Sequence, residues 1–147
     1  MLKLIHASKI YHESGVCALH GVDLTVARGD YVSITGASGS GKSTLIHILG
    51  LLDTLTDGSY LLEGADVSRL PPQALARLRS ERIGFVFQRF QLIPGMTALE
   101  NVELALQICK DPLDAKEVLE EVGLGDRLDN FPAQLSGGEQ QRVSIAR

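Results

Sequence analysis

The chain has 147 residues, of which 44% are hydrophobic and 22% charged, a composition typical of an ordinary globular domain. Its net charge of −4 argues against binding to nucleic acid by neutralisation of phosphates. It has no apolar run near the roughly 20 residues of a membrane span and no N-terminal signal segment. Cys17 and Cys109 form no metal or redox motif, so we expect free thiols in a cytosolic, reducing compartment.

The first predicted elements are two strands, over Leu2–Tyr11 and Ala18–Val26. In the second segment Val22, Leu24 and Val26 alternate with polar residues, which is typical of a half-buried strand. Two antiparallel strands are therefore expected at the start of the chain.

A glycine-rich stretch with the pattern G-x-x-x-x-G-K-[ST] follows. The β-branched and aromatic run Asp30–Thr35 predicts a strand before it, and the run to Leu49 predicts a buried helix after it. Strand, glycine loop and helix form the arrangement of a phosphate-binding loop. The residues of this loop are Gly36, Ala37, Ser38, Gly39, Ser40, Gly41, Lys42, Ser43 and Thr44.

Each residue type in this loop has a chemical role toward a nucleoside triphosphate. Glycines let successive backbone N–H groups point into one concavity, and the start of the following helix adds positive potential. Lys42 can reach the β- and γ-phosphates, and the Ser43 hydroxyl can bind Mg²⁺. A glycine-rich turn that matches by chance is the alternative, and the flanking elements argue against it.

Tyr11 is a candidate for stacking on the base of the nucleotide. It lies at the end of the first predicted strand, and base–aromatic stacking contributes about 1–3 kcal/mol. The alternative is a tyrosine at the end of a strand with no role in binding, and the spacing of the residues does not decide between the two.

The middle of the chain predicts further elements of both kinds. A strand is expected over Ser59–Glu63, after the turn signal Asp57-Gly58. A helix is expected from Pro71-Pro72 to about Glu81, and a buried strand over Ile83–Phe87, which ends at Gln88.

The next region is predicted to be a helical insert. Thr97 and Glu100 form a capping box, Asp111 and Pro112 suit the start of a helix, and Gly123 suits its end. The helical segments are expected at residues 97–109, 111–123 and 124–131.

The last element is predicted to be a helix that runs from Ser136 to Arg147. Ser136 suits the N-cap, and Gly137 and Gly138 leave backbone N–H groups uncovered. The sequence therefore predicts a second helix start that can bind an anion. A capped turn without a ligand is the alternative.

Taken in this order, these motifs resemble the nucleotide-binding domain of ABC transporters, and the resemblance covers essentially the whole chain. Gln88 is similar to the glutamine of the family's Q-loop, and Tyr11 to its adenine-stacking aromatic residue. The family signature resembles Leu135–Gln140. The sequences of Gly36–Thr44, Ile83–Gln88 and Thr97–Val102 resemble those of the bacterial subfamily that includes lipoprotein-releasing, macrolide-exporting and antimicrobial-peptide systems.

The resemblance implies an α/β fold: a P-loop NTPase (RecA-like) core with an N-terminal antiparallel β subdomain and a helical insert. It divides the chain into a β subdomain and phosphate-loop core at 1–88, a Q-loop and helical subdomain at 89–135, and the signature with its helix at 136–147.

One part of the family pattern is not present. After the signature the family has a hydrophobic strand ending in Asp-Glu, a loop aspartate and a switch histidine, whereas all four histidines here precede the signature. The resemblance therefore implies a partial domain that lacks the C-terminal part of the core, with none of the family's catalytic acids in this chain.

The resemblance also implies cofactors and partners. ATP would bind the loop at Gly36–Thr44, and Mg²⁺ would be held by Ser43 and Gln88. Two copies would associate head to tail, and a membrane permease would contact roughly Arg89–Met96 at the inner face of the cell membrane. The signature residues that would act on the partner's nucleotide are Ser136, Gly137, Gly138, Glu139 and Gln140.

The expected function is the ATP-binding subunit of a membrane transporter, which couples ATP binding and hydrolysis to export or extraction. Three alternatives stay open. The first is an ATP-dependent dimerisation module that binds but does not hydrolyse ATP. The second is an ABC protein of DNA repair or translation, which the acidic charge opposes, and the third is a small-molecule kinase, which the signature opposes.

Overall fold

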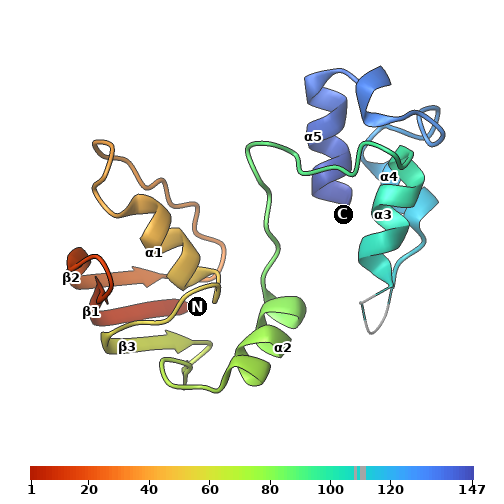
Figure 1. Ribbon diagram of the computed structural model, residues 1–147. Helices are drawn as coiled ribbons and strands as arrows, with labels where there is room; N and C mark the ends of the chain where they lie inside the picture. Colours follow the sequence, from red (N-terminus) through yellow and green to blue (C-terminus); the bar gives the residue numbers. More distant parts are fainter. Residues whose placement is uncertain (108, 110–111) are drawn as a thin grey trace. The chain divides into compact units, whose positions relative to one another are not determined.

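The computed structural model describes residues 1–107, 109 and 112–147. These residues form two compact units, Met1–Gly84 and Phe85–Arg147 (Figure 1). Each unit has its own hydrophobic core.

The first unit contains a four-stranded antiparallel sheet with the order β2-β1-β3-β4. Its strands are β1 (Leu2–Tyr11), β2 (Val16–Val26), β3 (Asp57–Leu62) and β4 (Ala65–Asp66). The strands expected at 2–11, 18–26 and 59–63 are confirmed within a few residues. Tyr11 pairs with Val16 across the turn between β1 and β2, so the end of β1 lies beside the start of β2.

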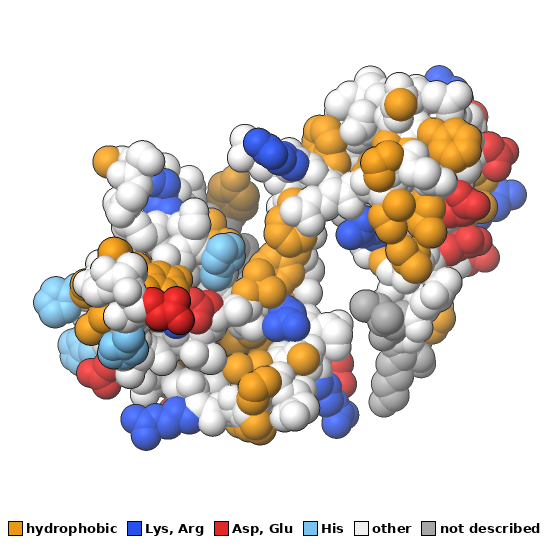
Figure 2. Space-filling view, in the orientation of Figure 1, with side chains coloured by type: hydrophobic (Ala, Val, Ile, Leu, Met, Phe, Trp, Pro, Cys, Tyr) orange, Lys and Arg blue, Asp and Glu red, His pale blue; other side chains and the backbone are white. Residues whose placement is uncertain are grey.

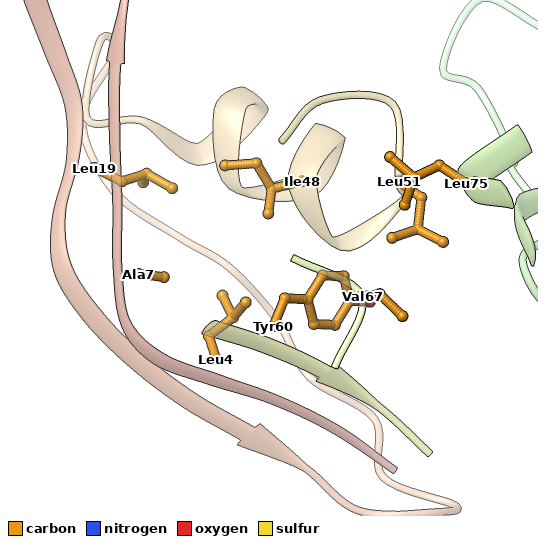
Figure 3. Close-up of a cluster of buried hydrophobic side chains, with 8 residues drawn as sticks. All are labelled: Leu4, Ala7, Leu19, Ile48, Leu51, Tyr60, Val67 and Leu75. Atoms are coloured by element: carbon orange, nitrogen blue, oxygen red, sulfur yellow. The ribbon is translucent and has the colours of Figure 1, made fainter. Parts of the chain in front are cut away.

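Two helices accompany the sheet, α1 (Lys42–Leu49) and α2 (Pro72–Arg82). The side chain of Ile48 on α1 lies among core residues of the strands in the close-up view (Figure 3). The buried side chains of this core are Leu4, Ala7, Leu19, Ile48, Leu51, Tyr60, Val67 and Leu75. The core therefore fixes α1 against β1 and β2.

The second unit is helical. Its helices are α3 (Ala98–Leu106), α4 (Ala115–Glu121), the short 3₁₀ turn η1 (Pro132–Gln134) and α5 (Gly137–Ala146). Its buried hydrophobic residues are Ala98, Val102, Ala115, Leu119, Leu124, Leu135 and Val143. Across the described residues, no helix combines the length and the apolarity that crossing a membrane requires.

A buried asparagine fixes the segment that leads into α3. The Asn101 side chain is fully buried, and its Oδ1 accepts a hydrogen bond of 2.8 Å from the backbone N–H of Ile93. Its Nδ2 donates to the carbonyl oxygens of Ile93, Met96 and Thr97. The amide thus satisfies both its acceptor and its donor inside an apolar core, as burial requires.

Two expected strands are not formed. Residues 30–35 and 83–87 pair with no strand in the described part of the chain, and Tyr31, Val32 and Val86 are 97%, 45% and 58% exposed. The physical reason is that β-propensity favours a strand only where a neighbouring strand completes the hydrogen-bond ladder. Hydrophobic side chains accordingly reach the surface of both units (Figure 2).

The helical predictions are confirmed in part. The capping box of Thr97 and Glu100 is present, but α3 ends at Leu106 instead of Cys109. Helix α4 begins three residues after Pro112, because the Asp114 side chain accepts hydrogen bonds from the first backbone N–H groups of that helix. The expected cap Asp111 lies outside the described residues. Gly123, with φ of 72°, follows the end of α4 as expected.

The helix expected at 124–131 is wrong, since this segment consists of turns. The carbonyl oxygens of Leu128 and Asn130 accept hydrogen bonds of 3.0 and 2.9 Å from the N–H groups of Leu99 and Ala98. Backbone groups that a helix would use internally therefore complete the start of α3 instead.

The matched pair Ile48 and Ile46 on α1 tests the packing of the first unit. Ile48 is 1% exposed and Ile46 is 48% exposed. We expect Ile48→Ala to lower the free energy of unfolding by about 2–5 kcal/mol because it leaves a cavity in the core. Ile46→Ala should cost less than about 1 kcal/mol. Urea unfolding followed by circular dichroism measures both, and equal losses would contradict this packing.

Candidate functional site

The phosphate-loop motif is positioned by the start of α1. Gly41 is the N-cap residue with φ of 85°, a left-handed conformation that favours glycine, and no side chain caps the helix start. The first backbone N–H groups of α1 are thus left without a side-chain acceptor, as in helix starts that bind anions.

The Lys42 ammonium lies over the loop that precedes it. Its Nζ donates hydrogen bonds to the carbonyl oxygens of Gly36 and Ala37 at 2.9 and 2.6 Å, and to Ser40 Oγ at 3.4 Å. The loop therefore closes around a positive charge whose hydrogen bonds are all to exposed groups, which a stronger anionic acceptor can replace.

Gly41 also makes a close backbone approach to strand β2. A Cβ atom added to Gly41 would overlap the carbonyl oxygen of Ala18 and lie 3.1 Å from the side chain of Leu19. Only glycine meets both conditions here, the left-handed φ and the absent side chain. This approach joins the phosphate loop to the β1–β2 hairpin.

A cavity of about 430 Å³ lies within the first unit, where the phosphate loop meets the β1–β2 hairpin. It is lined by Tyr11, Val16, Cys17, Ala18, Ser38, Gly39, Gly41, Lys42, Ser43 and Thr44. The structure thus brings the predicted aromatic residue and most of the predicted phosphate loop to one cavity. The sequence did not predict Val16, Cys17 and Ala18 as cavity residues. They line the cavity because Val16 pairs with Tyr11 across the β1–β2 turn.

The side chain of Tyr11 is held from outside this cavity. Its Oη donates a hydrogen bond of 2.9 Å to Asp53 Oδ2, and the Lys9 ammonium lies 5.0 Å from its ring centroid. Lys9 Nζ in turn donates to Asp53 Oδ1 and, at 2.8 Å, to the carbonyl oxygen of Thr54. Lys9 shares a strand face with Tyr11, two residues away, whereas no local signal pointed to Asp53, which follows α1.

The charge on Asp53 is stabilised by these partners. Partial burial of its carboxyl group opposes ionisation, but hydrogen bonds from Lys9, the Thr54 backbone and Tyr11 outweigh it and lower the pKa of Asp53 below its ordinary value. Asp53 is therefore an anion at neutral pH, and a strong acceptor for the Tyr11 hydroxyl.

The predicted signature lies at the start of α5. Ser136 Oγ accepts a hydrogen bond from the N–H of Glu139, and a Glu139 carboxylate oxygen accepts one of 2.7 Å from the N–H of Ser136. Arg127 Nε donates to the other carboxylate oxygen at 3.2 Å. Hydrogen bonds from Ser136, with a smaller contribution from Arg127, lower the pKa of Glu139 to about 2.

The segment after Gln88 contacts this signature helix within the second unit. A Cβ atom built on Gly137 would lie 4.0 Å from Phe90 Cζ, and Arg147 Nη1 donates a hydrogen bond of 2.8 Å to the carbonyl oxygen of Gln91. The segment that follows Gln88 is thus hydrogen-bonded to the C-terminal end of α5 through Arg147, and its Phe90 ring lies near the start of that helix. Gln88 itself is exposed. Gln88 and the signature belong to the second unit, and the phosphate loop to the first.

Comparison with known proteins places these motifs in one family. The family model described as ABC transporter matches residues 19–147. An uncharacterized ABC transporter ATP-binding protein of Thermotoga maritima is 54% identical over all of this chain and 66% of its own length. The lipoprotein-releasing system ATP-binding protein LolD of Shewanella frigidimarina is 49% identical over 64% of its length. The macrolide export ATP-binding/permease protein MacB of Brucella melitensis is 50% identical over 24% of its length.

Solved structures agree with these relatives. The dimeric structure of the bacterial ABC transporter cassette MJ0796 is 43% identical, with a TM-score of 0.82 over 99% of this chain and 68% of that chain. A post-hydrolysis state of the same cassette, bound to ADP and Pi, is 41% identical with a TM-score of 0.83. The α/β P-loop NTPase fold is thus confirmed. The chain spans 66% or less of the lengths of the three relatives named above.

Two left-handed glycines with almost the same φ test the close approach at the loop. Gly41 has φ of 85° and lies against Ala18, whereas Gly64 has φ of 86° and open space around it. Alanine costs roughly 1–2 kcal/mol of backbone strain at either position. Gly41→Ala must also displace β2, so we expect it to abolish binding of MgATP in isothermal titration calorimetry. Gly64→Ala should bind as the unaltered chain does, and equal binding by both variants would contradict the geometry.

Proposed function

This chain belongs to the ABC transporter ATP-binding family, and from that premise we propose that it forms the nucleotide-binding part of a membrane transporter's ATP-binding subunit. In that subunit, binding and hydrolysis of ATP would drive export of a substrate or its extraction from the membrane. LolD and MacB, two of its relatives, are by name a lipoprotein-releasing and a macrolide export protein. We propose the inner face of the cell membrane as the place of action.

The observation that carries this proposal is the cavity that Tyr11 and the phosphate loop line together. The loop presents Lys42 and the uncapped start of α1, which suit a polyphosphate. Tyr11 presents an aromatic ring at the same cavity, which suits a base. Phosphate and base sites that open on one cavity match a nucleoside triphosphate better than either site does alone.

Mg²⁺ would be held by the Ser43 hydroxyl and the Gln88 side-chain oxygen, which are the hard oxygen ligands that this ion takes. Ser43 lines the cavity. The ion would supply positive charge that offsets the charge of the triphosphate, while Lys42 and the α1 N–H groups would bind and orient the phosphates.

We further propose that two copies bind ATP between them, head to tail. In each copy the start of α5 would approach a γ-phosphate held by the phosphate loop of the other. The related cassette MJ0796 is described as a dimer, which supports this arrangement. Nothing in the comparisons favours the alternative of a module that binds ATP without hydrolysis.

A permease would contact the segment around Arg89–Met96. Of its apolar residues, Leu92 packs on the second core, whereas Ile93 is 37% exposed. The hydrogen bonds of Asn101 hold Ile93 and Met96 in place. Leu92 thus packs on the helical unit itself, and Ile93 stays a candidate contact for the permease.

The two free cysteines provide a test of the nucleotide site. Cys17 lines the cavity and Cys109 lies in the second unit, and both are exposed. We expect MgATP to slow alkylation of Cys17 severalfold, because bound nucleotide covers it, and to leave Cys109 unchanged. Peptide mapping by mass spectrometry after timed exposure to iodoacetamide measures both sites in one sample.

Lys42→Ala should remove this protection, since it removes the cation that binds the β- and γ-phosphates. Lys3→Ala, which removes an exposed lysine of the same unit, is the matched control and should keep the protection. If Cys17 reacts equally fast with and without MgATP in the unaltered chain, the proposed site is wrong.

The role of the signature in a partner copy is tested by Ser136→Arg. The larger cationic side chain removes the cap of α5 and fills the space that a γ-phosphate of the partner would need. We expect the monomer to bind MgATP as before and the nucleotide-dependent dimer to be lost in size-exclusion chromatography with light scattering. Ser80→Arg on α2 is the control. A dimer that persists in Ser136→Arg would contradict the contact in trans.

A further inference from the structure

We infer that Asp53 is a positioning residue for the nucleotide base: together with Lys9, it fixes the ring of Tyr11 in the orientation that lines the phosphate-loop cavity. The inference rests on the proposed function, because it assigns the ring of Tyr11 to the base of the bound nucleotide. Asp53 and Lys9 would touch no part of the nucleotide, since neither lines the cavity.

Three interactions restrain the Tyr11 side chain. The hydrogen bond from Oη to Asp53 fixes the far end of the ring, and the Lys9 ammonium lies over it at 5.0 Å from the centroid. The ion pair of Lys9 with Asp53 connects these two contacts into one cluster. The side chain of Lys9 is only 12% exposed and that of Asp53 26%. The ion pair of Lys9 and Asp53 is therefore less screened by solvent than an exposed surface pair.

The backbone around Asp53 is itself tied to the end of β1. Thr56 Oγ1 accepts a hydrogen bond of 3.0 Å from the N–H of Ile10, and the N–H of Thr56 donates one of 2.9 Å to the carbonyl oxygen of Ser8. The N–H of Asp53 donates to the carbonyl oxygen of His47 on α1 at 3.2 Å. The segment from Asp53 to Thr56 is therefore held against both α1, which precedes it in the chain, and the end of β1.

Helix α1 thus positions both the phosphate site and the base site of the proposed nucleotide. Its first turn carries the phosphate loop, and Asp53, just beyond its last turn, holds the aromatic ring. The distance between phosphate site and base site is thus set through one rigid helix of eight residues, about 12 Å long.

A ring that is fixed before binding loses less conformational entropy when a base stacks on it. Immobilising one rotamer-rich side chain weakens binding by roughly two- to tenfold. We therefore expect a loss of about that factor in ATP affinity when the restraint is removed, with no loss for a ligand that has no base.

The test compares MgATP with magnesium tripolyphosphate in isothermal titration calorimetry of the full chain. Tyr11→Phe keeps the ring and removes only the hydroxyl that reaches Asp53, and Asp53→Ala removes the acceptor. Each should weaken ATP about two- to tenfold and leave the tripolyphosphate affinity unchanged. The double variant should lose no more than Asp53→Ala alone, because Asp53→Ala already removes the acceptor of the Tyr11 hydroxyl.

Tyr31→Phe is the matched control, since Tyr31 is 97% exposed and removal of its hydroxyl should change neither affinity. Tyr11→Phe keeps the test decisive if Asp53→Ala does not fold. Unchanged ATP affinity in Tyr11→Phe would overturn the inference. So would a parallel loss of ATP and tripolyphosphate, which indicates a structural role only.

The affinities of the unaltered chain for ATP and tripolyphosphate distinguish a failure of this inference from a failure of the proposed function. If it binds both ligands, and ATP no more tightly than tripolyphosphate, the base is not recognised and the positioning role is refuted while the phosphate site remains. If it binds neither ligand, the proposed function fails, and the inference fails with it.

Discussion

The candidate site depends on the close backbone approach between Gly41 and Ala18. A side chain at Gly41 would overlap the Ala18 carbonyl oxygen, so this contact forms only with glycine. It joins the phosphate loop to β2, and β2 pairs with β1 up to the Tyr11–Val16 pair. Through this connection Tyr11 and Lys42 face one cavity, although thirty residues separate them in the sequence. The hydrophobic core below, with Ile48 and Leu19, maintains the approach by fixing α1 against the sheet (Figure 3).

The parts that sequence reasoning predicted are those with local physical causes. The glycine pattern of the phosphate loop, the alternation of β2, the capping box at Thr97 and the N-cap at Ser136 each depend on residues within a few positions of one another. These features can therefore be predicted from the sequence without knowledge of the fold. The resemblance to the ABC family is carried by the same local motifs, and the family match confirms it.

The parts that it missed depend on contacts between distant residues. Asp53 reaches Tyr11 across 42 residues, and the N–H groups at the start of α3 use the carbonyl oxygens of Leu128 and Asn130. The two expected strands that do not form have the same cause, a dependence on distant residues. Residues 30–35 and 83–87 have the composition of strands, but a strand also needs a partner, and in the described chain no neighbouring strand completes their ladders. Composition is a local property, whereas pairing is not.

The two helix starts that suit anions differ in how they are completed, and this difference favours different roles. The start of α1 has no side-chain cap and has Lys42 beside it, so it offers both free N–H groups and a positive charge. The start of α5 already contains the Glu139 carboxylate, which Ser136 and Arg127 keep ionised with a pKa of about 2. That carboxylate offsets the positive potential of the helix start. Alone, α5 should attract a free anion weakly, which suits an element that closes on a phosphate already held by the loop of another copy.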